Sequence, residues 1–300
     1  MKRVRIFHGR VEGGSKNLHD SSVDMVIADP PYSIGVGGVK WDFVKEYMPF
    51  ALTWLRECVR LLRPGGALLL YGSPERLHIA RMSILLVDDL GMRHVQDMPW
   101  VYTQGSQLSN SIALMHSHTP TCLRVCTGGD ARMENMKAYA VRHERLVWFE
   151  KPGGVRVFNA VDAAEHYSEE DRAVALAKGV GRVTNEALDR GRPPRTYIDV
   201  PRENSRSKER KYGKHPSMKP LSLCERLIKV HSNTGDTVFV PFAGSGSECI
   251  SAAKLERKAI GFETEEDYMD LMRKRLKGHG LETLSELLPD DSSKLAKDNA

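Results

Sequence analysis

The 300-residue sequence has little of what marks secreted, membrane-bound or zinc-stabilised proteins. Its five cysteines are odd in number and include no Cys-X-X-Cys pair, so neither a disulfide framework nor a common zinc knuckle is expected. No apolar run approaches the roughly 18 residues that span a bilayer, and the basic N-terminus lacks the apolar core of a signal peptide. We therefore expect a cytoplasmic or nucleoid-associated protein with no membrane partner.

Two histidines and two cysteines do lie close together, at His116, His118, Cys122 and Cys126. Imidazole and thiolate are common zinc ligands, but this spacing matches no common structural site, and the segment has the pattern of a strand. The sequence thus predicts no metal site.

Charge is nearly balanced, with 44 lysines and arginines against 39 acidic residues, and the small basic excess weakly favours a polyanionic partner. Residues 202–214 are more strongly basic, because they hold six cations and two glutamates. The cations are Arg202, Arg206, Lys208, Arg210, Lys211 and Lys214. This stretch could follow a phosphate backbone, although most basic loops are only solvated.

Apolar patterning indicates alternating strands and helices. Val23–Ala28 is a short β-branched run that predicts a buried strand, and it ends at Asp29-Pro30-Pro31-Tyr32, where the prolines stop regular pairing. Apolar residues at helical spacing follow from Phe50 to Leu62. Pro64-Gly65-Gly66 then separates this helix from a strand at Ala67–Tyr71.

A second unit of this kind lies nearer the C-terminus. The pattern predicts a helix at Leu221–Ser232, a strand at Thr237–Val240, a helix at Glu248–Leu255 and a strand at Lys258–Phe262. Such alternation predicts an α/β fold with a doubly wound, Rossmann-like parallel sheet.

The composition changes between the two units. Residues 131–214 are charged, weakly periodic and rich in Arg, Gly and Pro towards their end, so we interpret them as an inserted recognition region. Residues 1–130 and 215–284 would form the two halves of the main domain. Residues 285–300 are polar and are expected to form a flexible tail.

A glycine turn follows the strand predicted at Thr237–Val240. Its sequence, Pro241-Phe242-Ala243-Gly244-Ser245-Gly246, lets the backbone approach a ligand and enter a helix whose free N–H groups attract anionic or carbonyl groups. Glu263 stands 19 positions after Gly244, where an acid reaches the ribose in nucleoside sites. A lone glycine turn is usually only a turn, so the signal needs support from elsewhere.

The tetrapeptide at residues 29–32 provides that support. Asp29 offers a carboxylate acceptor, Pro30 a carbonyl whose nitrogen carries no donor, and Tyr32 an aromatic face. Two acceptors can stabilise the tetrahedral nitrogen that forms when a base amine is methylated, and the ring can stack on an extruded base. A proline-stiffened turn is the purely structural interpretation of the same residues.

With both motifs in place, the sequence resembles the DNA amino-methyltransferases that modify adenine N6 or cytosine N4. It is most similar to their beta group, in which the catalytic motif precedes the cofactor motif. The likeness rests on Ser22–Tyr32, Trp41-Asp42, Leu55–Ser73, His215–Ile228 and Pro241–Glu263.

The resemblance implies a Rossmann-like methyltransferase fold with permuted motif order, S-adenosylmethionine as cofactor and double-stranded DNA as partner. The catalytic residues it implies are Asp29, Pro30, Pro31 and Tyr32. The cofactor-binding residues it implies are His215, Ser217, Lys219, Pro241, Phe242, Ala243, Gly244, Ser245, Gly246, Phe262 and Glu263. Glu263 would hold the ribose, and Lys219 would lie near the cofactor's carboxylate, although it could also be a solvated lysine before a helix.

Three positions depart from the family pattern. The family commonly has Gly-Asp where this chain has Gly9-Arg10, Asp where it has Val240, and His-Glu near His118-Thr119. These departures affect the expected adenine contacts of the cofactor and the local packing, whereas the catalytic tetrapeptide is intact.

By the same resemblance, Asp at the first position of the tetrapeptide implies adenine N6 as the target, since family members with Ser there are more often cytosine-N4 enzymes. A cytosine-C5 enzyme would need a Pro-Cys nucleophile, and this dipeptide does not occur. Methylation of cytosine N4 or of RNA, and a catalytically silent nucleic-acid-binding subunit, remain as alternatives. A homodimer is one candidate for the active form, and the recognition sequence is not predicted.

Overall fold

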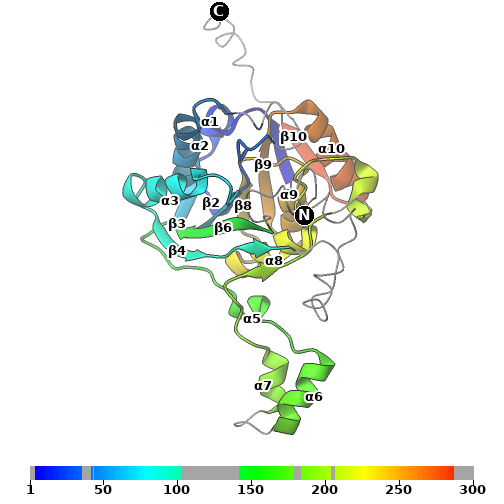
Figure 1. Ribbon diagram of the computed structural model, residues 1–300. Helices are drawn as coiled ribbons and strands as arrows, with labels where there is room; N and C mark the ends of the chain where they lie inside the picture. The colour runs from blue at the N-terminus through cyan, green and yellow to red at the C-terminus, as the bar shows by residue number, and fades with distance from the viewer. Residues whose placement is uncertain are drawn as a thin grey trace, which may run out of the picture.

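The computed structural model describes residues 4–35, 42, 44–102, 142–178, 184–203 and 207–286. Its strands are β1 (Val4–His8), β2 (Val23–Ala28), β3 (Leu62–Gly72), β4 (Arg93–Asp97), β5 (Trp100–Val101), β6 (His143–Glu150), β7 (Ile198–Asp199), β8 (Thr237–Val240), β9 (Lys258–Glu263) and β10 (Thr283–Glu286). They form one sheet in the order β10-β1-β9-β8-β2-β3-β6-β5-β7, with β4 also paired to β6. This sheet forms the centre of the molecule (Figure 1).

The helices of the described ranges are α1 (Val11–Gly14), α2 (Tyr47–Leu61), α3 (His78–Asp88), α5 (Ala160–Ala163), α6 (Glu169–Lys178), α7 (Asn185–Arg190), α8 (Leu221–His231), α9 (Ser247–Lys254) and α10 (Glu266–Gly278), with 3₁₀ helices η1 (Ser15–Asn17) and η7 (Lys208–Tyr212). From β10 to β3 all neighbouring strands are parallel, whereas β6 is antiparallel to β3. The predicted α/β doubly wound sheet is therefore confirmed.

Helices cover both faces of this sheet. Alternate residues of β2 point to opposite sides: Met25 and Ile27 join one core cluster with residues of α8, α9 and α10. Val26 and Ala28 join the other with residues of α2 and α3. A strand that is buried on both faces must be largely apolar, which is why five of the six residues of β2 (VDMVIA) are apolar and buried, while Asp24 is only partly buried.

Part of the predicted inserted region belongs to the sheet. β6 lies within residues 131–214 and pairs along its length with β3, from Ala67 opposite Glu150 to Gly72 opposite Arg145. Farther along, α5 packs against α8, whereas α6 and α7 project from the body of the molecule (Figure 1). The domain boundaries themselves stay a prediction, since residues 103–141 lie outside the described part.

The predicted tail begins later than expected. Ser285 and Glu286 continue β10, where they lie opposite Ile6 and Phe7 of β1. Residues 287–300 lie outside the described ranges.

Within the ranges above, no helix is both long and apolar enough to cross a membrane. The same residues contain no group of three or more His, Cys, Asp or Glu side chains suited to a metal ion. The His116, His118, Cys122 and Cys126 cluster lies outside them.

Candidate active site

The two sequence motifs meet at one edge of the sheet. β2 and β8 are adjacent and parallel, with Met25 opposite Val238 and Val26 opposite Phe239. Both strands therefore end at the same edge, β2 leading into the residue 29–32 tetrapeptide and β8 into the glycine turn. After β8 the chain continues to β9 on one side of this pair, and after β2 it continues to β3 on the other side. The gap between β2 and β8 is therefore a topological switch point, the place where ligands bind in open α/β sheets.

A buried carboxylate fixes the backbone after the tetrapeptide. Asp42 Oδ1 accepts hydrogen bonds from the N–H groups of Tyr32 (2.8 Å) and Ser33 (2.9 Å). Asp42 Oδ2 accepts from those of Ile34 (2.9 Å) and Gly35 (2.6 Å). Four consecutive N–H groups converge on one side chain, which explains why an aspartate ten positions after Tyr32 accompanies the motif.

The neighbouring helices hold the carbonyl groups of the same loop. The Tyr47 hydroxyl donates to the Pro31 carbonyl at 2.7 Å, and His78 Nδ1 lies 3.3 Å from the Tyr32 carbonyl. Tyr47 and His78 are themselves stacked, with ring centroids 3.8 Å apart. The first turns of α2 and α3 thus position residues 31 and 32.

A buried lysine lies between two carboxylates at the centre of the edge. Lys219 Nζ is 2.6 Å from Asp29 Oδ2 and 3.2 Å from Glu144 Oε2. The Tyr32 hydroxyl lies 2.6 Å from Asp29 Oδ1 and 2.9 Å from Glu144 Oε2, and it can donate its one proton to either. Glu144 reaches this edge because β6 is antiparallel, so the amino end of β6 lies beside the carboxyl ends of its parallel neighbours.

The charges in this cluster determine one another. Burial alone would lower the pKa of Lys219, but the charges of Asp29 and Glu144 outweigh it and raise that pKa. Burial raises the pKa of Asp29, an effect that Lys219 opposes and Glu144 reinforces. Burial would also raise the pKa of Glu144, but Lys219 and Arg202 lower it below its usual value. Of the two carboxylates, Asp29 is therefore the better proton acceptor.

Accessibility separates the three side chains. Asp29 is 16% exposed, whereas Lys219 is 3% and Glu144 7% exposed. The Lys219 ammonium is also enclosed by aromatic rings, with Nζ 5.0 Å from the centroid of Tyr71 and 5.6 Å from that of Tyr32. Of these three side chains, Asp29 is the most accessible to solvent.

The glycine turn requires its glycines. Gly244 and Gly246 have φ values of +50° and +78°. A Cβ on Gly246 would lie 2.5 Å from the Met272 side chain, and one on Gly244 would lie 3.1 Å from the His215 ring. Burial, followed by the nearby positive charge of Lys219, lowers the pKa of His215 to about 3, so this ring is neutral.

Glu263, at the end of β9, binds the glycine turn. Its Oε2 accepts from the Gly244 N–H at 2.7 Å, and its Oε1 accepts from the N–H groups of Thr264 and Glu265, both at 2.8 Å. A carboxylate oxygen has two lone pairs, so Oε2 can accept a further hydroxyl hydrogen.

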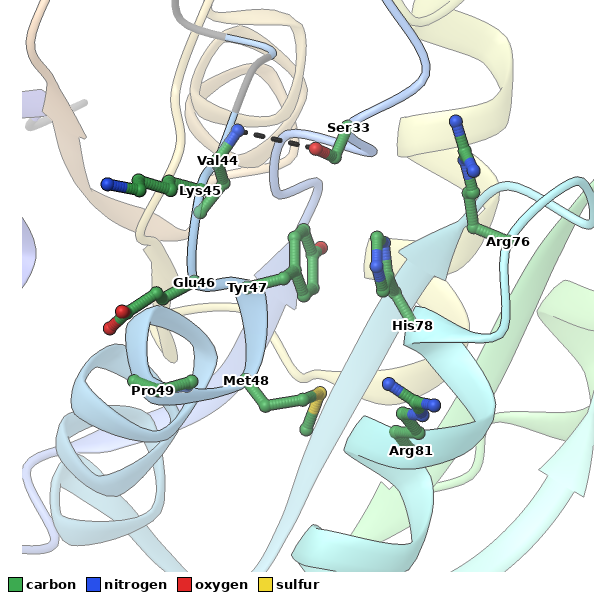
Figure 2. Close-up of a pocket in the computed structure, with 10 residues that line it drawn as sticks. All are labelled: Ser33, Val44, Lys45, Glu46, Tyr47, Met48, Pro49, Arg76, His78 and Arg81. Atoms are coloured by element: carbon green, nitrogen blue, oxygen red, sulfur yellow. Dashed lines mark hydrogen bonds between the residues drawn. The ribbon is translucent and has the colours of Figure 1, made fainter.

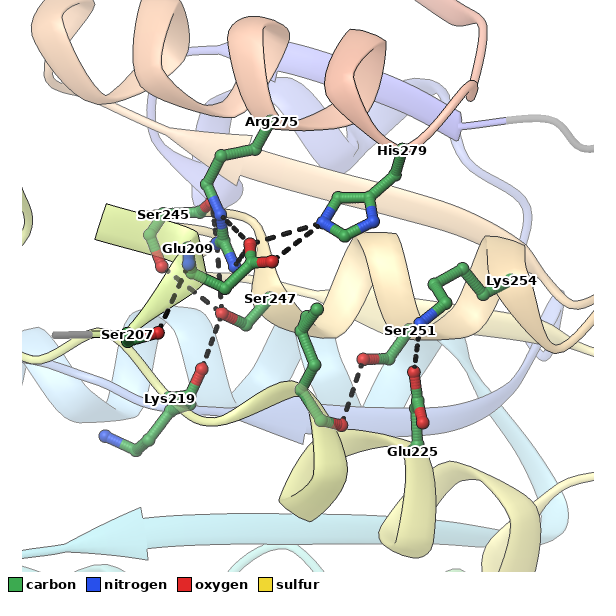
Figure 3. A network of polar contacts seen from close by, with 11 residues as sticks. Ser207, Glu209, Lys219, Glu225, Ser245, Ser247, Ser251, Lys254, Arg275 and His279 are labelled. Atoms are coloured by element: carbon green, nitrogen blue, oxygen red, sulfur yellow. Dashed lines mark hydrogen bonds and ion pairs between the residues drawn. The ribbon is translucent and has the colours of Figure 1, made fainter. Parts of the chain in front are cut away.

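A buried arginine joins the turn to its surroundings (Figure 3). Arg275 Nη1 donates to the Ser245 carbonyl at 2.5 Å and to Ser247 Oγ at 3.0 Å, while Arg275 Nη2 donates to Glu209 Oε2 at 2.8 Å. Ser247 Oγ donates in turn to the Lys219 carbonyl at 2.7 Å. Lys219 therefore connects the two motifs, since its backbone contacts α9 and its ammonium contacts Asp29.

Comparison with known protein families identifies the family of this chain. The profile of the family described as DNA methylase, which groups N6 and N4 enzymes, matches residues 23–274. The chain belongs to this family. The match runs from the first residue of β2 into α10 and so includes both motifs and the segment between them.

Relatives of this DNA methylase include two curated bacterial enzymes. The Type II methyltransferase M.HpaI of Haemophilus parainfluenzae is 29% identical over 286 residues, which cover 93% of this chain and 77% of that one. The Type II methyltransferase M2.DpnII of Streptococcus pneumoniae is 25% identical over 276 residues, which cover 86% and 84%.

Solved structures share the fold. The Thermus thermophilus protein TTHA0409, crystallised with S-adenosyl-L-methionine, has a TM-score of 0.58 at 23% identity, covering 95% of this chain and 99% of that one. The cytosine-N4-specific PvuII DNA methyltransferase has a TM-score of 0.60 at 16% identity, covering 95% and 96%. The predicted permuted methyltransferase fold is confirmed.

The residues at the edge fit S-adenosylmethionine, the methyl donor of this family. A carboxylate with a remaining acceptor site, Glu263, stands at the end of β9 beside a glycine turn that begins a helix. This donor and acceptor set suits a nucleoside that carries an amino-acid chain.

The predicted DNA-binding cations of this methylase do not all face solvent in the same way. Arg202 is half exposed, pairs with Glu144 Oε1 at 2.9 Å and lies 4.0 Å over the Tyr102 ring. Arg210 Nη1 donates to the His215 carbonyl at 2.9 Å. Like Arg202, three lysines are exposed, namely Lys208, Lys211 and Lys214. Arg206 lies outside the described residues.

Sequence reasoning missed Glu144. The His-Glu pair that the resemblance places near His118-Thr119 is present at His143-Glu144, so a search along the chain for that dipeptide would have found it. Within the described ranges, the other two departures from the family pattern form no hydrogen bond or ion pair with Asp29, Glu144 or Lys219. Val240 is buried in the core, and Arg10 is exposed and pairs with Glu12 at 3.8 Å.

Proposed function

We propose that this DNA methylase transfers the methyl group of S-adenosylmethionine to the exocyclic N6 of an adenine that is flipped out of double-stranded DNA. The observation that carries the proposal is the position of Asp29, a partly exposed carboxylate backed by buried Lys219 at the end of β2, beside the glycine turn of β8. A base amine that enters there meets an acceptor whose charge and orientation are already fixed.

A second acceptor for the amine is the Pro30 carbonyl. The carbonyl groups of Pro31 and Tyr32 are already held by Tyr47 and His78. Among the described residues no hydrogen bond is found to the Pro30 carbonyl. Asp29 and Pro30 together can therefore take both hydrogens of one amino group, which favours the tetrahedral nitrogen over the planar one.

The cofactor supplies an electrophilic methyl group on a sulfonium sulfur. As the bond from N6 to this methyl forms, the bond from the methyl to sulfur breaks, and N6 then releases one proton. Asp29 accepts that proton more readily than an exposed aspartate would, because burial raises its pKa. Lys219 keeps Asp29 in place and remains protonated throughout.

For cofactor binding we propose that Glu263 accepts a ribose hydroxyl and that the turn from Pro241 to Gly246 lies along the methionine part. His215, which lies next to Gly244, and Ser217, whose N–H donates to His215 Nδ1, would complete that side. Lys219, which the resemblance places near the cofactor's carboxylate, has its ammonium between Asp29 and Glu144, so we assign it to the positioning of Asp29. The exposed lysines of residues 208–214 would contact phosphates.

The direct test is transfer of labelled methyl groups to unmethylated genomic DNA, followed by nucleoside mass analysis. We expect N6-methyladenine. N4-methylcytosine as the only product would refute the adenine assignment but leave amino-methyl transfer intact, whereas incorporation into RNA alone would exclude DNA as the substrate.

Asp29→Ala tests the catalytic assignment. We expect methyl transfer to fall by on the order of 100-fold or more, with S-adenosylmethionine affinity within a few-fold of wild type, because Asp29 acts on the transition state. Asp88→Ala, at an exposed position in the last turn of α3, is the matched control. Normal turnover of Asp29→Ala would remove Asp29 from the mechanism.

A further inference from the structure

A hollow lies beside the catalytic loop, on the side of α2 and α3 (Figure 2). It is open to solvent and has a volume of about 510 Å³. Its lining consists of Ser33, Val44, Lys45, Glu46, Tyr47, Met48, Pro49, Arg76, His78 and Arg81. None of the catalytic or cofactor residues assigned above belongs to this lining.

Two helices begin at this hollow, and neither is capped by a side chain. The N-cap residue of α2 is Glu46 and that of α3 is Leu77, and neither side chain accepts a hydrogen bond from its helix. The first turns of both helices, at Tyr47 and His78, line the hollow. Uncapped N–H groups and the positive ends of two helix dipoles therefore face the same space, which favours an anion.

Two arginines add full positive charges. Arg76 and Arg81 are exposed, and within the described ranges neither forms an ion pair. Burial is the main cause that lowers the pKa of His78, and the hydrogen bond to the Tyr32 carbonyl opposes it. The positive charges of Arg76 and Arg81 lie close enough to lower this pKa further. Figure 2 shows both guanidinium groups on the His78 side of the hollow, whereas Lys45 and Glu46 extend away on the other side.

The shape selects the class of anion. The faces of Tyr47 and His78 are stacked on each other, so neither ring has that face free to stack on a base or a nucleoside. Guanidinium groups and helix N–H groups instead suit the oxygens of a phosphate. The hollow is also rigidly tied to the catalytic loop, since Tyr47 bonds to Pro31 and His78 to Tyr32.

We propose that this hollow binds a backbone phosphate of the DNA strand that carries the target base, with Arg76 and Arg81 as its ligands. The proposal deepens the proposed function and rests on it for the identity of the strand. A phosphate held here is at a fixed distance from Asp29, so binding it would place the flipped nucleotide in register with the catalytic loop.

The test uses the variant Arg76→Gln/Arg81→Gln in the full chain. Its affinity for a fluorescein-labelled duplex is measured at increasing KCl, together with labelled-methyl transfer to genomic DNA. Loss of one phosphate contact should reduce the slope of log affinity against log salt by about 1 and weaken binding about 10-fold or more at low salt. S-adenosylmethionine affinity should stay at the wild-type value, whereas turnover at saturating DNA should fall, because the flipped nucleotide loses its fixed register with the catalytic loop.

Lys16→Gln/Lys258→Gln is the control, because it removes two exposed cations that do not line the hollow. A slope and affinity equal to those of this control would overturn the phosphate site, even if wild type methylates DNA normally. Absence of methyl transfer by wild type would instead remove the proposed function, while the salt slope would still decide whether the hollow binds phosphate. Unchanged melting temperatures of both variants establish that folding is intact.

Discussion

Single residues decide the chemistry of this protein through contacts between distant parts of the chain. Asp29 and Lys219 are 190 positions apart and yet 2.6 Å from each other. Each could be singled out from its motif, but nothing in either motif indicates that the lysine contacts the aspartate and not the cofactor. That contact depends on strand order, which brings α8 to the end of β2, and local sequence does not encode it.

Glu144 is a second residue whose place in the site could not be predicted from local sequence. Its carboxylate is 7% exposed and contacts both Lys219 and Tyr32, but it lies at the start of β6 in a region whose charged composition suggested an insertion. Only the antiparallel pairing of β6 with β3 makes it part of the site.

Glu144→Gln should shift the pH dependence of methyl transfer. The negative charge of Glu144 is one of the causes that raise the pKa of Asp29, so its removal lowers that pKa. The proposed mechanism needs ionised Asp29, and the acid limb of the rate profile should therefore move to lower pH. The measurement is kcat against pH at saturating DNA and cofactor.

Glu169→Gln, an exposed position on the projecting helix α6, is the control and should leave the limb in place. An acid limb that moves to higher pH in Glu144→Gln, or does not move, would show that Glu144 does not act on Asp29 electrostatically. A uniform loss of rate at all pH values would indicate a purely structural role.

At the scale of elements, the ends of the strands were predictable where prolines and glycines interrupt the apolar runs. β2 and β8 have the predicted bounds, because each is a short, mainly apolar run that ends one or two residues before a proline. β10 was not predicted, since the sequence TLSE is too polar to indicate a strand by itself. It forms because the outer edge of β1 offers unpaired N–H and C=O groups, a reason that lies in the sheet and not in the segment.

The turn between β8 and α9 can be tested with a pair of glycines. Gly246→Ala should destabilise the fold and weaken S-adenosylmethionine binding, because the residue has φ +78° and an added Cβ would lie 2.5 Å from Met272. Gly235→Ala has a similar φ of +89° and no atom within 4 Å of the added Cβ. The control Gly235→Ala should therefore lose only the free energy needed to hold alanine in the left-handed conformation, about 1 to 2 kcal/mol.

Chemical denaturation gives the stability difference, and calorimetric titration with S-adenosylmethionine gives the affinity. We expect the loss of stability in Gly246→Ala to exceed that in Gly235→Ala, with weakened cofactor binding in Gly246→Ala alone. Equal losses in the two variants, with cofactor affinity retained in both, would mean that Met272 moves aside at little cost and that the turn does not need its glycine.

At the scale of the molecule, the order of the motifs in the chain is irrelevant to where they meet. The tetrapeptide at residues 29–32 comes first and the glycine turn 212 positions later, counted from Asp29 to Pro241, but adjacent parallel strands bring both to one edge. The alternation of strands and helices was enough to predict this sheet. It was not enough to place the phosphate-binding hollow or the Glu209–Arg275 contact, because these depend on how loops and helix ends pack after the sheet has formed.

Two buried, neutral histidines make the stability of the fold depend on pH. His215 lies over the glycine turn, and His231 lies at the end of α8 with its ring 4.4 Å from that of Trp148. In both residues burial lowers the pKa to about 3, with smaller contributions from nearby cations. Glu248 acts in the opposite sense, since burial raises its pKa to about 7 and its stabilising effect is lost as pH rises towards that value.

His231→Gln isolates one of these contributions. A histidine whose pKa is depressed in the folded state stabilises the protein above its unfolded pKa of about 6.5, and this stability is lost as pH falls from there towards 3. The free energy of unfolding of wild type should therefore decrease more steeply with acid than that of the variant, by up to about 1.4 kcal/mol per pH unit. Exposed His19→Gln should follow wild type. Parallel curves for wild type and His231→Gln between pH 6.5 and 4 would mean that the folded protein admits the proton at this position, and hence that the packing between α8 and β6 opens more easily than the buried ring pair implies.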